Sequence, residues 1–311
     1  MKSEIERRHH RRGSICLADH SSWYWRFQHH VGRDLLPLLR VVSRLLGYRT
    51  WQPVPPAVQD DLMTWMQFII PGWLHPGNLE SFVYCLERLP SDAPIIEIGT
   101  FAGLSLNHLI FLLCRAGRQN PVFSVDEWRF ESVDEDEWKF EGAHNGLIKG
   151  SHISHDAYRA HVMETFRRNV TLFSGDRLPH HIELNSDAFF AAWAGSEQKL
   201  DFFGNTVQLG GPIAFAYIDG EHTYEQSTKD FQNVNRYLEQ GGFIIFDDSA
   251  DHGWRGSTRT AQEAAMSGRY EVVAKNPNYC LRKCYSSLPM TSDLDTFSGV
   301  PAPLPVRDCR A

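Results

Sequence analysis

Acidic side chains follow two apolar segments in the second half of the chain. Asp219 comes directly after the segment 213–218, and Asp247 and Asp248 come directly after the segment 242–246. If these segments are neighbouring parallel strands, about 5 Å apart, their carboxyl ends meet at one edge of a sheet. Carboxylates that close repel one another unless protons or a cation neutralise them. Oxygen-only ligands suit a hard cation, so the pattern predicts a Mg²⁺ site.

One histidine stands beside this predicted cluster. His222 follows Asp219 by three residues, at a turn into a helix that Thr223 and Gln226 would cap. An imidazole there could accept a proton from a substrate hydroxyl. The alternative is that His222 is a capping or core-edge residue and that the aspartates cap helices and turns without a metal.

A glycine turn in the segment 94–105 would place a ligand at the same edge. The run 95–98 is apolar except for Glu97, and Gly99 and Gly103 separate it from a helical pattern. Glycines let a backbone approach a ligand closely, as in doubly wound nucleotide-binding folds. Glu97 is costly to bury without a partner, so we expect it to face a ligand. The alternative is an ordinary strand, turn and helix.

A second acidic residue suits a nucleotide. The apolar segment 122–125 ends in Asp126, which stands 23 residues after Gly103. A carboxylate at this offset can accept hydrogen bonds from both hydroxyls of a ribose. The pattern therefore favours a nucleotide-type cofactor.

The composition favours a small-molecule partner. The chain has 311 residues, of which 42% are hydrophobic, a net charge of −7, and six cysteines without Cys-x-x-Cys spacing. It can bury a substantial core, and its net charge gives no general attraction to nucleic acid or to an anionic membrane. The scattered cysteines favour a reducing, cytoplasmic setting. No run of about 18 apolar residues predicts a membrane span.

The two ends of the chain differ from its middle. Residues 1–75 hold a basic arm and an amphipathic helix at 34–47, which we expect to pack on the main domain or to form a homo-oligomer, with a membrane surface as the alternative. Residues 76–285 form the main domain, and 286–311 are a Pro- and Ser-rich tail. An insertion at 126–156 is expected to be a lid or substrate wall, because long loops in compact domains are usually functional.

Apolar periodicity and capping residues predict the other elements of the main domain. Helices are expected over residues 60–70, 78–89, 104 to about 115–117, and 157–169, and strands over 181–184, 270–274 and 279–282. A further helix begins after Thr223 and is closed by Gly241 and Gly242. The last two strands are expected to form a hairpin across 276–278.

Four motifs resemble those of class I S-adenosylmethionine-dependent methyltransferases. They are Glu-Ile-Gly-Thr-Phe-Ala-Gly-Leu-Ser at 97–105, Ser-Val-Asp at 124–126, Ile-Asp-Gly-Glu-His-Thr-Tyr at 218–224 with Asp230, and Gly-Gly-Phe-Ile-Ile-Phe-Asp-Asp at 241–248. The branch with macrolide-sugar O-methyltransferases and cephalosporin hydroxylase-like proteins is the most similar, and catechol O-methyltransferases resemble the chain more distantly. The last two motifs are the most specific.

The resemblance implies a fold and a reaction. The fold is Rossmann-like α/β, with a seven-stranded, mostly parallel sheet, one antiparallel edge strand, and helices on both faces. The reaction is methyl transfer from S-adenosylmethionine to a hydroxyl of a small molecule, assisted by Mg²⁺ and a histidine base. The implied catalytic residues are His222 and Asp219, and the implied metal ligands are Asp219, Asp247 and Asp248. The implied cofactor residues are Glu97, Gly99, Phe101, Gly103, Ser105, Asp126, Ser186, Asp187 and Asp219.

Two other functions fit part of the sequence. An NAD-dependent oxidoreductase would also use Asp126 on a ribose, but the chain lacks the Gly-x-Gly-x-x-Gly turn at Gly99 and Gly103. A non-catalytic cofactor-binding or scaffold protein of the same fold is the second alternative, since a fold alone does not fix a function. Methylation of nucleic acid is disfavoured by the acidic balance.

Overall fold

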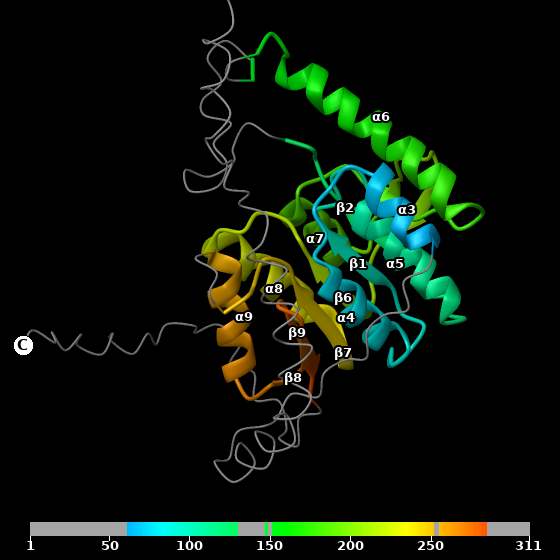
Figure 1. Cartoon of the computed structure of the whole chain (residues 1–311). Coiled ribbons are helices and arrows are strands. Elements are labelled where there is room, and N and C mark those ends of the chain that lie inside the picture. The colour runs from blue at the N-terminus through cyan, green and yellow to red at the C-terminus, as the bar shows by residue number, and fades with distance from the viewer. Residues whose placement is uncertain (1–60, 130–146, 149–150, 252–254, 285–311) are drawn as a thin grey trace, which may run out of the picture. The chain divides into compact units, whose positions relative to one another are not determined.

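The computed structural model of the protein describes residues 61–129, 147–148, 151–251 and 255–284 (Figure 1). The chain divides into two units, 1–52 and 53–311, and every described residue lies in the second. The basic arm, the amphipathic helix at 34–47 with its proposed role in oligomerisation, most of the 126–156 insertion, and the tail lie outside the described residues.

A seven-stranded sheet in the order β3-β2-β1-β6-β7-β9-β8 forms the centre of the second unit. Its strands are β1 (Ile95–Ile98), β2 (Val122–Val125), β3 (His180–Ile182), β6 (Ile213–Ile218), β7 (Leu238–Phe246), β8 (Tyr270–Lys275) and β9 (Tyr279–Lys283). The first five of these strands pair in parallel, and β9 runs antiparallel to both β7 and β8. The predicted Rossmann-like, mostly parallel sheet is confirmed.

The antiparallel strand lies inside the sheet, and not at its edge as the resemblance implied. The hairpin across 276–278 forms as predicted, but it inserts β9 beside β7 and leaves β8 at the edge. The burial of the two strands agrees with these positions, because Tyr279, Cys280 and Leu281 of β9 are all buried, whereas most residues of β8 are only partly buried. The turn at 276–278 returns β9 into the position between β7 and β8, where it is more buried than the edge strand.

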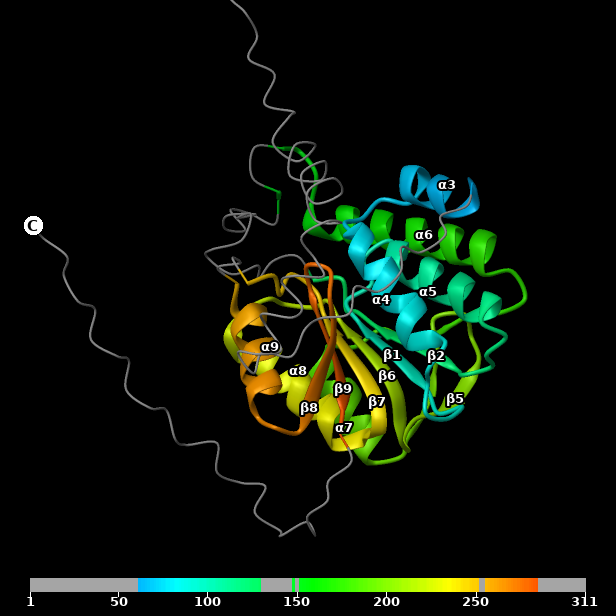
Figure 2. The ribbon, with the colours of Figure 1, turned by 60° about the horizontal axis from the view of Figure 1, so that its bottom comes forward.

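Helices cover both faces of the sheet (Figure 2). One face carries α3 (Asp61–Ile69), α4 (Pro76–Leu86), α5 (Leu104–Arg115) and α6 (His155–Ser174), and the other carries α7 (Ser186–Ala194), α8 (Tyr224–Tyr237) and α9 (Gly256–Met266). Helices α7 and α9, and a hairpin of β4 (Gln198–Leu200) with β5 (Thr206–Gln208), were not predicted from the sequence. Within the described ranges, no helix combines the length and apolar character needed to cross a membrane.

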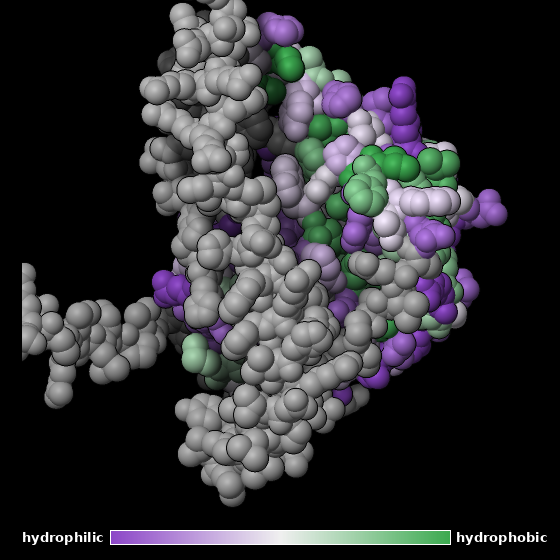
Figure 3. Space-filling view, viewed as in Figure 1, coloured by the Kyte–Doolittle hydropathy of each residue, from purple (hydrophilic) through white to green (hydrophobic). Residues whose placement is uncertain are grey.

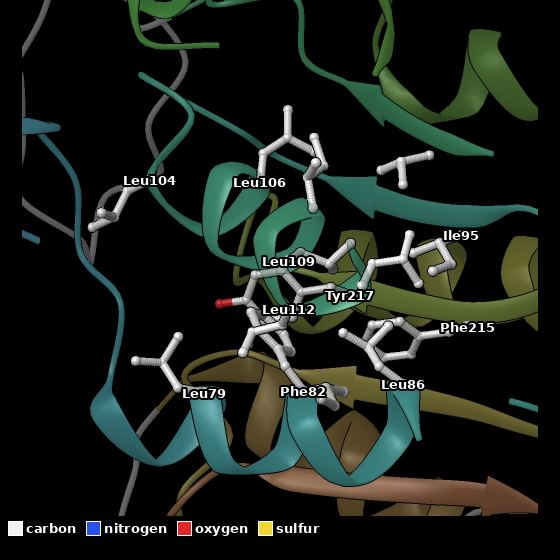
Figure 4. Packing of buried hydrophobic residues seen from close by; sticks show 14 of the residues in the cluster. Leu79, Phe82, Leu86, Ile95, Leu104, Leu106, Leu109, Leu112, Phe215 and Tyr217 are labelled. Carbon is white, nitrogen blue, oxygen red and sulfur yellow. The ribbon is translucent and has the colours of Figure 1, made fainter. Parts of the chain in front are cut away.

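Packing of α4 and α5 on the sheet holds the glycine turn in place (Figure 4). The ring of Phe82 on α4 meets Tyr217 of β6 edge to face, with ring centroids 5.0 Å apart. Leu106 and Leu109 of α5 are fully buried in the same layer. Because burying a large apolar side chain contributes about 1.5–3 kcal/mol, this layer fixes the start of α5 at the carboxyl edge of the sheet.

Helix α8 ends earlier than the glycine pair predicted. Thr223 caps its start, accepting a hydrogen bond from the backbone N–H of Gln226 at 3.2 Å, as expected. The helix stops at Tyr237 because Leu238 is already extended and begins β7. Gly241, with φ of +80°, lies within that strand and does not close the helix.

Apolar side chains are exposed on α3 and just after it (Figure 3). Trp65, Phe68, Ile69 and Trp73 are each more than half exposed. The ring of Trp73 lies 5.8 Å from that of Phe101 in the glycine turn. This apolar surface therefore borders the turn that was predicted to bind a ligand.

Candidate active site

The glycine turn between β1 and α5 has the geometry that the sequence predicted. Gly99 and Gly103 have φ values of +80° and +86°, in the region that favours glycine. A Cβ atom on Gly99 would lie 2.1 Å from the backbone oxygen of Asp219. The turn therefore packs directly against the end of β6, where the acidic residues begin.

Asp126 holds the glycine turn through its carboxylate. Its Oδ2 accepts hydrogen bonds from the backbone N–H groups of Thr100 and Phe101, each at 3.0 Å, and its Oδ1 accepts one from Trp128 at 2.7 Å. Burial raises the pKa of Asp126, and these three N–H donors oppose the rise. A carboxylate has about four lone-pair sites, so the described contacts leave about one for a ligand.

Trp128 belongs to the core, although the sequence placed it in the lid. Its side chain is buried, its Nε1 donates to the backbone oxygen of Phe101 at 2.8 Å, and its ring lies 4.3 Å from that of His181. Together with Asp126, it fixes Phe101 at a φ of +45°. Trp128 is therefore part of the core and not of a lid, and α6 begins at His155, two residues earlier than predicted.

Glu97 is a fully buried carboxylate at the centre of β1. Neither of its carboxylate oxygens has a hydrogen-bond partner among the described residues. Burial raises the pKa of Glu97 to about 7; the nearby hydroxyls of Ser105 and Thr100 limit the rise without completing a hydrogen bond of normal geometry. An unpartnered buried carboxylate at the mouth of the turn fits a cationic donor such as the ammonium group of an amino acid.

The predicted acidic residues and His222 do meet at the ends of β6 and β7. The Nε2 atom of His222 lies 3.3 Å from Oδ2 of Asp248 and 3.8 Å from Oδ1 of Asp219. Burial and the neighbouring carboxylate of Asp247 raise the pKa of Asp219 well above its usual range. The tertiary structure thus assembles one acidic site from two segments of the chain.

Three other residues, which the sequence did not single out, form hydrogen bonds or an ion pair with the carboxylates of Asp247 and Asp248. Oδ1 of Asp247 accepts hydrogen bonds from the side-chain amides of Asn78, at 2.5 Å, and Asn278, at 2.8 Å. Arg255 forms an ion pair with Asp248. No local pattern marks these partners, because they lie on α4, in the hairpin turn and at the start of α9.

The donor set does not fit the predicted Mg²⁺ site. Within the part of the chain that the structure describes, no group of three or more His, Cys, Asp or Glu side chains is arranged to hold a metal ion. One oxygen of Asp247 is taken by two amides, and Asp248 faces a guanidinium group. Protons, amide donors and Arg255 therefore offset the acidic charge in this arrangement.

Ser186 and Asp187 lie at the start of α7, after β3, with Asn185 as the capping residue. The hydroxyl of Ser186 donates to Oδ1 of Asp230 at 2.6 Å. The exposed Asp187 accepts a hydrogen bond from Asn233 at 3.3 Å. Both residues are thus tied to helix α8, a link that the sequence did not predict.

The sheet order and the glycine turn define a class I, Rossmann-like methyltransferase fold. Residues 96–249, from β1 to just beyond β7, match the family Methyltransf_24, described as a methyltransferase domain. These residues, just under half of the chain, are therefore a methyltransferase domain.

Other proteins resemble it over much of their length. The uncharacterized protein R132 of Acanthamoeba polyphaga mimivirus is 29% identical over 231 residues, which cover 71% of this chain and 84% of that protein. The calicheamicin methyltransferase CalS11 is 14% identical with a TM-score of 0.45, covering 86% of this chain and 94% of that one. The O-methyltransferase NovP is 15% identical with a TM-score of 0.42, covering 69% of this chain and 84% of that one.

Proposed function

We propose that the protein transfers the methyl group of S-adenosylmethionine to a hydroxyl of a small molecule, such as a sugar, a phenol or a polyol. The observation that carries this proposal is the position of His222, whose Nε2 lies 3.3 Å from Asp248 and 3.8 Å from Asp219 at the carboxyl edge of the sheet. A histidine held by acidic groups beside the glycine turn suits the removal of a hydroxyl proton.

The residues at the glycine turn would hold the cofactor. The unpartnered carboxylate of Glu97 would receive the ammonium group of the methionine part, and the free lone pair of Asp126 would accept from a ribose hydroxyl. The turn and the residues around it would line the rest of the cofactor: Gly99, Phe101, Gly103 and Ser105 near the methionine and ribose, Ser186 and Asp187 near the adenine, and Asp219 beside the turn.

The cofactor supplies an activated sulfonium methyl group when bound. The protein then has to align the acceptor oxygen with the carbon–sulfur bond and take up its proton. His222 accepts that proton, and Asp248, whose Oδ2 lies 3.3 Å from Nε2, holds the ring in place at the carboxyl edge of the sheet. No step is assigned to Mg²⁺, because the amides on Asp247 and the guanidinium on Asp248 occupy the groups that would bind it.

Calorimetric titration with S-adenosylhomocysteine, with NADH as the control, tests the cofactor. We expect micromolar binding of S-adenosylhomocysteine only, followed by turnover in a screen of sugar, phenol and polyol acceptors. Binding of NADH alone would establish the oxidoreductase alternative. Tight binding of S-adenosylhomocysteine without turnover of any hydroxyl acceptor would favour a non-catalytic, cofactor-binding protein.

A further inference from the structure

A buried polar cluster joins helices α7 and α8 beside the proposed cofactor site. Asp230 of α8 is only 1% exposed. Its Oδ1 accepts hydrogen bonds from the hydroxyl of Ser186 at 2.6 Å and from the side-chain amide of Gln226 at 3.1 Å. The same amide nitrogen also lies 3.1 Å from the oxygen of Ser186. Each of the three side chains therefore contacts the other two.

These contacts fix the direction of the hydrogen bonds at Ser186. A serine hydroxyl has one hydrogen to donate and two lone pairs that accept. Its hydrogen is directed to Asp230, and one lone pair accepts from Gln226. What remains at Ser186 is a single lone pair, so this oxygen can accept a hydrogen bond from a ligand but has no hydrogen left to donate.

The second carboxylate oxygen of Asp230 is unusual. Oδ2 is buried and has no hydrogen-bond partner among the described residues. It would lie 3.5 Å from a Cβ atom on Gly220, in the turn that follows β6. Burial raises the pKa of Asp230 to about 6, and the carboxylates of Asp187 and Glu221 add to the rise. Burying a carboxylate oxygen without a hydrogen-bond partner is energetically unfavourable, so we expect Asp230 to have a role beyond packing.

We infer that Asp230 is a positioning residue that makes Ser186 a hydrogen-bond acceptor. The site therefore selects a base that carries an exocyclic amine, as adenine does, over a base that carries a carbonyl at the same ring position. The inference rests on the proposed function, in which Ser186 lies at the adenine. A carbonyl would face the lone pair of Ser186 with no hydrogen between them, and such a mismatch is unfavourable once the bound base excludes water from the partly buried Ser186.

Two ligands that differ at this group and in the proton on the neighbouring ring nitrogen test the inference, and the variants below separate the part that depends on Asp230. S-adenosylhomocysteine carries an amine on its base, and S-inosylhomocysteine carries a carbonyl. We expect calorimetry to give the wild-type protein at least about tenfold higher affinity for the adenosyl ligand, the effect of one hydrogen bond to a buried group. In Asp230→Asn, the new amide can donate to Ser186 and free the serine hydrogen, so the preference should fall to within about twofold.

A matched control is available on the same helix. Glu225 is an exposed carboxylate that pairs only with Lys229 in the described contacts, at 3.2 Å. Glu225→Gln makes the same chemical change as Asp230→Asn, and it should leave the preference at the wild-type value. If Asp230→Asn does not fold in a thermal melt, Ser186→Ala carries the test, since it removes the accepting oxygen and should abolish the preference as well.

The outcomes separate this inference from the proposed function. A general loss of affinity in Asp230→Asn, with the wild-type preference intact, would mean that Asp230 is only structural and would overturn the inference. Equal binding of both ligands by the wild-type protein would overturn it too, while the methyltransferase assignment would stand. If the wild-type protein bound neither ligand, the proposed cofactor site would fail together with the inference.

Discussion

The imidazole Nε2 of His222 lies 3.3 Å from Oδ2 of Asp248, although 26 residues separate them in the chain. The contact exists because β6 and β7 are parallel neighbours whose ends meet at the same edge of the sheet. The contact holds the imidazole at the carboxyl edge of the sheet, where the proposed base has to lie.

Replacing His222 by alanine should reduce turnover by roughly 10²–10⁴-fold, the usual contribution of a general base. The affinity for S-adenosylhomocysteine should stay close to the wild-type value, since no cofactor contact is assigned to the imidazole. Initial rates with an accepted hydroxyl substrate, together with calorimetry, measure both effects. The control is His161→Ala, which removes an exposed histidine of α6 and should change neither quantity. Normal turnover in His222→Ala would eliminate the proposed base.

The pKa of Glu97 should make cofactor binding depend on pH. With a pKa of about 7 in the free protein, the carboxyl is neutral at pH 6 and ionised at pH 8. We expect the affinity for S-adenosylhomocysteine to rise across this interval, because only the ionised form attracts the ligand's ammonium group. Glu97→Gln should bind more weakly and lose this rise. A pH profile that is the same in both proteins would contradict the assignment of Glu97.

The same shift should affect the stability of the free protein. The usual pKa of 4.5 applies to the unfolded chain, and the folded value is about 7. Between these values the folded protein holds a proton that the unfolded chain has lost, so its stability falls as the pH rises from about 4.5 to about 7. Urea unfolding of wild-type protein and Glu97→Gln over this range should show a steeper fall in the wild type.

A pair of glycines separates the effect of close packing from that of backbone strain. Gly99 and Gly117 both have positive φ, +80° and +67°, but a Cβ on Gly99 would meet the backbone of Asp219 at 2.1 Å, whereas a Cβ on Gly117 has nothing within 4 Å. Gly117→Ala should therefore cost only the strain, about 1 kcal/mol. Gly99→Ala should cost clearly more and also weaken binding of S-adenosylhomocysteine, as measured by denaturant unfolding and calorimetry. Equal losses of stability and unchanged binding would mean that the turn does not depend on this contact.

Arg255 should compete with metal ions at the acidic site. Arg255→Ala leaves the carboxylate of Asp248 without its guanidinium partner, so Mg²⁺ should bind at least about tenfold more tightly than it does to the wild-type protein. Titration calorimetry with MgCl₂ measures the difference. Arg259→Ala, which removes an exposed arginine paired with Glu263, is the control and should match the wild type. Identical Mg²⁺ affinities in wild type and Arg255→Ala would refute this role of Arg255.

Much of the fold was predictable because the signals are local. Apolar runs at 95–98, 122–125 and 213–218 can hardly be anything but buried parallel strands, and the structure places β1, β2 and β6 there. Thr223 stands at the start of a helical pattern, where a threonine hydroxyl commonly caps a helix, and it does so here. Missed elements have weaker signals: α7 is apolar on nearly all sides, so its period is faint, and α9 begins without a side-chain cap.

Local signals also explain what could be predicted of the site. The carboxyl ends of parallel strands share an edge, so the sequence alone determined that Asp219, Asp247 and Asp248 would come close to the glycine turn. It also determined that a carboxylate, Glu97, would be buried in the strand before that turn.

Only the tertiary structure decided what each of these carboxylates faces. Asp247 meets Asn78 and Asn278, 169 and 31 residues away, and Asp126 turns to backbone N–H groups. Such partners depend on how helices and hairpins pack around the sheet. The residues next to a side chain in the sequence do not reveal which distant donor it will meet. The strand order that puts β9 inside the sheet is also a tertiary property, since it depends on the pairing of β9 with β7, which is distant in the chain.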